Sequence, residues 1–234
     1  MATIDYARFT RVLNRCEEVA QEPGMKASVV LVYKEVLKGP SQAYLAADDG
    51  VTKAGSSFGK ENKEALGALQ ALDGVYREAR SVVAAFVTGI VLPDTLKTCR
   101  TDTDKVDAIE ALVGIFDEHT GEKWADTLSS GDFGTRALVT IKEIHEAIEA
   151  NKGLSEARTA RAAAYGPAYE AYLKLKRVVR NALGPASKQY KRIHFRDANA
   201  TVTEKVTEKV TGKEEPKLIV NGAPKSGDAP MVDP

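Results

Sequence analysis

Residues 65–90, ALGALQALDGVYREARSVVAAFVTGI, decide the fold class of this chain. The apolar residues fall at alternating steps of four and three, the heptad spacing of a helix that packs along one seam. They are Ala65, Leu69, Leu72, Tyr76, Ala79, Val83, Phe86 and Ile90. The spacing predicts a helix that starts near Phe58, ends before Pro93 and packs at a shallow angle in an antiparallel bundle.

A second helical pattern covers residues 154–196. Its apolar stripe is Tyr165, Ala168, Tyr172, Leu175, Val179, Ala182 and Ala186. The phrase Gly-Pro-Ala-x-x-x-Tyr occurs in it twice, at 166–172 and 184–190. Proline lacks an amide donor and clashes with the preceding turn, so each Gly-Pro pair is expected to kink or restart the helix. The pairs either bend a long helix around its bundle, which we favour, or aim Tyr172 and Tyr190 at a partner.

Shorter helical patterns lie between these two. Residues 3–22 have one apolar stripe, whereas residues 27–38 suit a strand or a helix, and we favour the helix because no partner strand is nearby. Residues 39–57 are rich in turn-forming residues, which predicts a loop with one short helical piece. Thr101 or Thr103 is expected to cap a helix with the core positions Val106, Ile109, Val113 and Phe116.

Two further segments complete the helical region. Trp124 and Leu128 lie in a short segment that is expected to cover one end of the bundle. A helix over residues 133–151 is predicted to end at Asn151-Lys152-Gly153, and Ser155 to cap the next one. We therefore predict an all-α fold over residues 1–196: an elongated antiparallel helical bundle of four main helices plus shorter ones.

Residues 197–234 differ in character. Three tandem tetrapeptides, VTEK, VTEK and VTGK, begin at Val202, Val206 and Val210. A helix here would place like charges four residues apart, whereas Val and Thr favour an extended chain. We predict an extended C-terminal tail that acts as a binding arm and adds a strand to a second copy or another protein.

Composition restricts the protein's environment. The net charge is zero, with 33 basic and 33 acidic residues, so the whole molecule is not drawn to nucleic acid or anionic membranes. We expect no membrane association, because the sequence lacks a secretory signal pattern and a membrane-length apolar run. Cys16 and Cys99 have no metal-type spacing and are expected to be thiols in the cytoplasm, Cys16 in the core and Cys99 in a loop.

Motifs for catalysis or cofactor binding are weak. No histidine follows a glutamate by three residues, so the di-iron helix motif is absent. His145 and Glu149 could share a metal, but a solvated helix face explains them better. Residues 55–60, GSSFGK, differ from a phosphate loop in spacing and in lacking a preceding strand. We expect no catalytic, cofactor-binding or metal residues and no enzymatic activity.

Charge is unevenly distributed along the chain. Residues 101–126 are acidic through Asp102, Asp104, Asp107, Glu110, Asp117, Glu118, Glu122 and Asp126. Residues 171–196 contain only basic charges: Lys174, Lys176, Arg177, Arg180, Lys188, Lys191, Arg192 and Arg196. The two regions can pair within one molecule, remain solvated, or pair between molecules.

These observations favour a structural or interaction protein that self-associates or binds another protein through its charged helix faces and the arm. The alternative is a nucleic-acid-binding bundle that uses residues 171–196. The candidate interaction residues are Lys176, Arg180, Lys188, Lys191, Arg192, Arg196, Val202, Val206 and Val210.

Overall fold

A computed structural model describes residues 5–194 of the chain, and Tyr6–His194 form one compact unit. Most of the described residues are helical and none forms a strand, which confirms the predicted all-α fold. The elements are α1 (Tyr6–Gln21), α2 (Ala27–Val32), a π-helical turn η1 (Tyr33–Leu37), α3 (Lys38–Phe86), α4 (Asp102–Glu118), α5 (Lys123–Ser129), α6 (Asp132–Leu183) and α7 (Lys188–Arg192).

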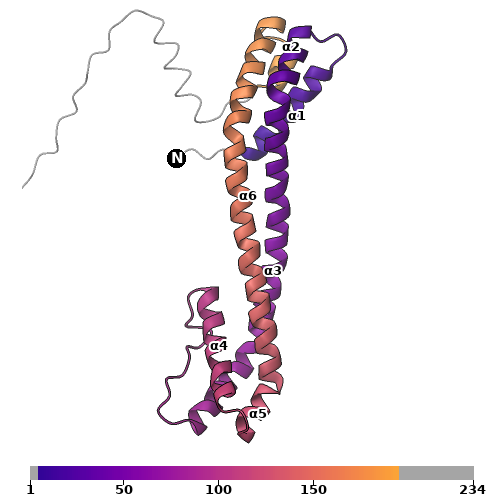
Figure 1. The fold of residues 1–234 in the computed structure, drawn as a ribbon. Helices are drawn as coiled ribbons and strands as arrows, with labels where there is room; N and C mark the ends of the chain where they lie inside the picture. Colours follow the sequence, from indigo (N-terminus) through magenta and orange to yellow (C-terminus); the bar gives the residue numbers. More distant parts are fainter. Residues whose placement is uncertain (1–4, 195–234) are drawn as a thin grey trace, which may run out of the picture. The chain divides into compact units, whose positions relative to one another are not determined.

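Two long antiparallel helices organise this unit (Figure 1). Helix α6 has 52 residues and α3 has 49, and α2 and η1 extend α3 without a break, so residues 27–86 are helical throughout. One register holds along the pair: the Lys26 ammonium contacts the Ala182 carbonyl, Asp48 pairs with Arg161, and the Thr140 hydroxyl contacts the Ala68 carbonyl. The paired residue numbers sum to a nearly constant value, as antiparallel helices without a slip require.

The shorter helices cover the two ends of this pair and leave its middle as two helices (Figure 1). At one end, the α1 end, helices α1 and α7 pack against α2, η1 and the adjoining parts of α3 and α6. At the other, the α4 end, helices α4 and α5 pack against α3 and α6. The predicted helices over residues 133–151 and 154–196 are one helix, α6, up to Leu183, and four-helix packing does not extend along the whole pair.

Each end has its own hydrophobic core. At the α4 end, Leu72 and Val83 of α3 are fully buried with Ile109 of α4 and Phe133 of α6. At the α1 end, the buried aromatic rings of Phe9, Tyr44 and Tyr172 meet edge to face or near it. The heptad seam is therefore a core element up to Val83, whereas Phe86 at its end is 62% exposed and Ile90 follows the helix.

Several local signals have the structure that the sequence predicts. The apolar stripe of residues 3–22 is buried in α1, and residues 27–38 are helical. Thr101 caps α4 in a capping box with Asp104, and α3 ends before Pro93. Gly184 ends α6 with a φ of 86°, a conformation that glycine adopts at little cost. Both cysteines are free, Cys16 buried and Cys99 half-buried.

The predicted loop over residues 39–57 is wrong, because this segment is the first part of α3. The widened turn η1 directly precedes Gly39-Pro40, and a wider turn relieves the clash between a proline ring and the carbonyl of the turn before it. Packing against α6 then outweighs the low helix propensity of Gly50 and Gly55; Leu154 lies opposite Gly55.

The predicted helix end at residues 151–153 and the predicted cap at Ser155 are also wrong, because α6 continues through them. Gly153 has no positive φ, so no left-handed cap forms there. Pro167 lies inside α6 and is exposed, so the first Gly-Pro pair does not end the helix, whereas the second one does. Ala186 follows that break and is exposed rather than in the stripe. The predicted arm at residues 197–234 lies outside the described residues.

Candidate interaction surfaces

The basic residues of the α1 end form an exposed surface. Its members come from the last turns of α6 and from α7, and we call them the basic surface: Lys174, Arg177, Arg180, Lys188 and Lys191. Within residues 5–194, none of the five forms an ion pair. Lys174, Arg177 and Arg180 follow at steps of three, so they lie along one side of α6. This surface offers several cations to an acidic partner.

Two of the predicted interaction residues have contacts within the chain. Arg192 forms ion pairs with Glu18 of α1, at 2.6 Å, and with Glu22, which directly follows α1. The Lys176 ammonium lies 5.9 Å from the ring centroid of Tyr172. Arg192 therefore holds α7 against α1, and of the predicted set Arg180, Lys188 and Lys191 belong to the basic surface. Arg196, Val202, Val206 and Val210 lie outside the described residues.

The acidic residues cover the α4 end, and all eight are exposed. Half have local roles: Asp102 pairs with Lys105, Asp104 and Asp126 accept hydrogen bonds from backbone N–H groups, and Glu122 accepts a hydrogen bond from the Trp124 indole. Hydrogen bonds from His119 and Trp124 lower the pKa of Glu122. The other four have no ion pair within residues 5–194, and we call them the acidic surface: Asp107, Glu110, Asp117 and Glu118.

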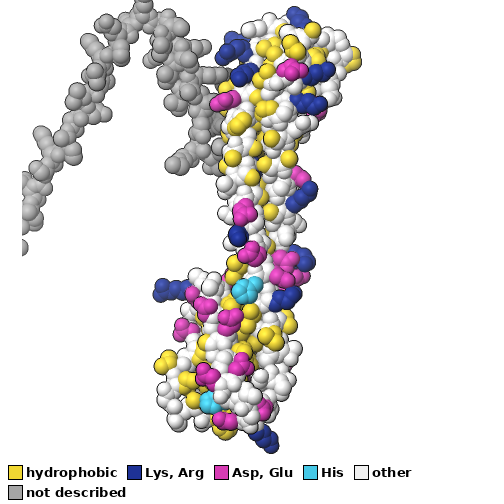
Figure 2. Space-filling model, viewed as in Figure 1, with side chains coloured by type: hydrophobic (Ala, Val, Ile, Leu, Met, Phe, Trp, Pro, Cys, Tyr) yellow, Lys and Arg dark blue, Asp and Glu magenta, His cyan; other side chains and the backbone are white. Residues whose placement is uncertain are grey.

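The two charged surfaces lie at opposite ends of the helical unit. Figure 2 shows this segregation, with magenta side chains dense near α4 and dark blue ones gathered at the α1 end. From Ala147, at the edge of the α4-end core, to Lys174 there is roughly 40 Å of helix at about 1.5 Å per residue. Pairing of the two surfaces within one helical unit is therefore excluded, and pairing between molecules or solvation remains.

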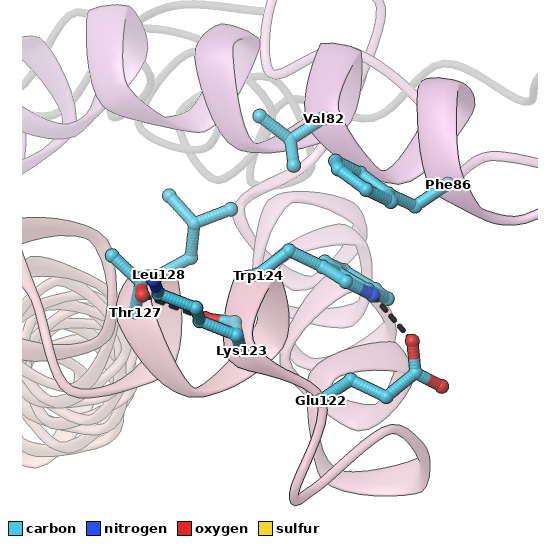
Figure 3. Close-up of a pocket in the computed structure, with 7 residues that line it drawn as sticks. All are labelled: Val82, Phe86, Glu122, Lys123, Trp124, Thr127 and Leu128. Carbon is cyan, nitrogen blue, oxygen red and sulfur yellow. Dashed lines mark hydrogen bonds between the residues drawn. The ribbon is translucent and has the colours of Figure 1, made fainter.

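An apolar groove opens at the α4 end between the last turns of α3 and helix α5 (Figure 3). Its volume is about 770 Å³, and its lining is Val82, Phe86, Glu122, Lys123, Trp124, Thr127 and Leu128. The Phe86 ring stacks on the Trp124 indole at 5.4 Å with an angle of 5° between the rings. The indole N–H donates to Glu122 at 2.5 Å, which holds the ring in place (Figure 3). The groove is thus a preformed aromatic site with a carboxylate at its edge.

The structure does not support the candidate metal and phosphate sites within residues 5–194. One group of carboxylates lies close together, from Glu61, Glu143 and Glu146, but Lys60 and Lys142 already form ion pairs with all three. His145 is exposed on α6, and His119 Nδ1 lies 2.8 Å from Glu122 Oε1. Residues 55–60 lie inside α3, so they form no phosphate-binding loop.

Comparisons with known proteins provide no further guide to the site: no protein-family model matches the chain, and neither a curated protein nor a solved structure is significantly similar to it. None of the helices between residues 5 and 194 combines the length and apolarity that a membrane span needs.

The sequence pattern missed the groove because Phe86 falls on the heptad seam and was assigned to the core. It also missed Leu31, which is 60% exposed at the α1 end. The spacing places both Phe86 and Ile90 on the seam, whereas α3 ends at Phe86, so no following helical turn covers this ring.

Proposed function

We propose that this protein is a non-enzymatic structural protein that associates with further copies of itself by joining the acidic surface of one copy to the basic surface of the next. The observation that supports this function is the segregation of uncompensated charge to the two ends of one helical unit. The charges within each surface repel one another, and a second copy supplies a surface of the opposite sign.

The geometry of the long helices α3 and α6 favours contacts between copies. A surface that contacts a different surface of the next copy makes a heterologous interface, which generates rings or open filaments. Two long helices of constant register separate the ends as a spacer, so one copy can contact two neighbours. A role in assembly or spacing suits such a unit.

Other parts of the proposal rest on the sequence. The segment 197–234 is proposed as an additional binding arm. Comparing the mass in solution of the full-length chain with that of a chain that ends at Arg196 tests this part.

The cysteines bear on the compartment. Cys16 is buried, and burial raises the pKa of its thiol, so it is an unreactive core residue. Two free cysteines support a reducing compartment such as the cytoplasm.

The mass of the full-length chain in solution tests the proposed function. Light scattering should show a mass that rises with protein concentration at low salt and falls toward that of one chain as salt screens the charges. Reversing the basic surface with Arg177→Glu and Arg180→Glu should abolish the rise. A single-chain mass at every concentration and salt level would overturn the proposal.

A further inference from the structure

The apolar groove at the α4 end has the features of a binding site, and its lining indicates what kind of group binds there. Phe86 is 62% exposed although it stacks on Trp124, so a large apolar area remains in contact with water. The groove is concave and held in place by the bond from Trp124 to Glu122, whereas scattered surface hydrophobics form no such site. Its charged lining residues are one acid and one base, Glu122 and Lys123, and both are exposed. The occupant should therefore be apolar at its centre and carry charges of both signs at its edge.

The α1 end presents such a feature. Among the described residues of that end, Leu31 is the exposed large hydrophobic side chain, on the outer side of α2. Lys34 and Glu35 follow one turn later, and both are exposed. The constant register between α2–α3 and α6 sets Leu31 level with Arg177 of the basic surface.

We propose that the groove of one copy binds Leu31 of a second copy, as the apolar centre of the contact between opposite ends. This inference rests on the proposed self-association and adds its specificity-determining residues. Leu31 enters beside the Phe86 and Trp124 rings, and the surrounding charges give the contact its direction. A desolvated apolar centre inside a charged rim is the usual arrangement of a protein interface.

Two substitutions and their mixture test the inference in the full-length protein. Leu31→Asp disables the plug but leaves the groove intact, and Phe86→Asp disables the groove but leaves the plug intact. Each variant alone should associate at least about 10-fold more weakly than the unmodified chain. An equimolar mixture should form one-to-one pairs, because Leu31→Asp still supplies a groove and Phe86→Asp still supplies a plug, although neither variant can extend the pair.

Matched controls are exposed apolar residues outside the groove. Leu138→Asp, at 68% exposure, controls for Phe86→Asp, and Leu66→Asp, at 49%, controls for Leu31→Asp. Both controls should leave association unchanged. Circular dichroism checks that Phe86→Asp folds, and Leu31→Asp, at an exposed residue far from the core of the α4 end, remains an independent test.

The outcomes separate this inference from the proposed function. Salt-sensitive association that neither Leu31→Asp nor Phe86→Asp weakens would overturn the plug and groove while leaving charge-driven assembly intact. A mixture that fails to recover association would also overturn the inference. If the unmodified chain keeps the mass of a single chain, both the proposed self-association and this inference would be overturned.

Discussion

The guanidinium of Arg161 lies 3.0 Å from the carboxylate of Asp48 and joins the two long helices near the α1 end. The Thr10 hydroxyl donates to the other oxygen of the same carboxylate at 2.8 Å, so α1 is tied to the same point. The guanidinium also lies 4.0 Å from the ring centroid of Tyr6. Both charged side chains are about four-fifths shielded from solvent, with 20% and 22% exposed. This pair therefore sets the register of α3 against α6.

Breaking the pair should destabilise the helical unit. We expect a double-mutant cycle of Asp48→Asn and Arg161→Met to give a coupling free energy of about 1 kcal/mol or more, measured by urea unfolding. The control is Asp49→Asn, whose partner Lys53 is exposed, and which should change the free energy of unfolding by less than about 0.5 kcal/mol. Equal effects of the two aspartate substitutions would contradict a register role.

The heptad seam supplies the core at the α4 end. Leu72 is fully buried, so Leu72→Ala should lower the free energy of unfolding by about 2–5 kcal/mol. Leu66→Ala, at a half-exposed leucine of the same helix, should cost much less. Similar melting temperatures for both variants would remove this seam from the core.

Glycines in the long helices should differ in their tolerance of alanine. Gly67 has open space where a Cβ would be, so Gly67→Ala should stabilise the protein by about 0.5–1 kcal/mol. At Gly134 a Cβ would lie 1.8 Å from the Ser129 carbonyl oxygen, so Gly134→Ala should destabilise by more than about 1 kcal/mol. Thermal unfolding of the two variants checks both signs, and stabilisation by Gly134→Ala would contradict the close approach of α5 to α6.

The Tyr76 hydroxyl joins α3 to α4. It contacts the carbonyls of Asp94, at 2.8 Å, and Ala108, at 3.0 Å, so Tyr76→Phe should cost about 1–3 kcal/mol. Burial raises the pKa of Tyr76 to about 12, from an ordinary value of 10.0. The neutral phenol therefore stabilises the fold fully below pH 10, and this contribution is lost as the pH rises through about 12.

An alkaline titration checks that assignment. Phenolate absorbance of the folded protein should show late-ionising tyrosines, and Tyr76→Phe should remove one while Tyr33, with a pKa of about 12, remains. If Tyr76→Phe instead removed a tyrosine that ionises near pH 10, the assignment of a buried, late-ionising hydroxyl to Tyr76 would be contradicted.

Sequence patterns predicted helix type and core face better than helix boundaries. The seam through Leu72, the α1 stripe and the Thr101 cap depend on neighbours within a turn or two, which the sequence displays. The continuity of α3 through Pro40 and of α6 through Gly153 depends on packing between residues about a hundred or more positions apart. Local propensity cannot report such packing. For the same reason, the sequence revealed the two charged regions but not their separation to opposite ends.

Nucleic-acid binding by the basic surface is expected to be weak. Tyr172 is fully buried and its hydroxyl donates to the Ile193 carbonyl at 2.8 Å, so this ring is not available to stack on a base. Labelled single- and double-stranded oligonucleotides should show no micromolar binding at near-physiological salt. Micromolar or tighter binding with a steep salt dependence would favour the nucleic-acid alternative.

The most direct test of assembly through opposite charged ends is zero-length cross-linking of a mixture of isotopically heavy and light chains. A carbodiimide joins an amine to a carboxylate only where they touch, and roughly 40 Å of helix separates the two surfaces within one unit. We predict heavy–light cross-links from Lys174, Lys188 or Lys191 to Glu110, Asp117 or Glu118, which disappear at high salt. Cross-links confined to residues within one end, or no link between heavy and light chains, would contradict the account.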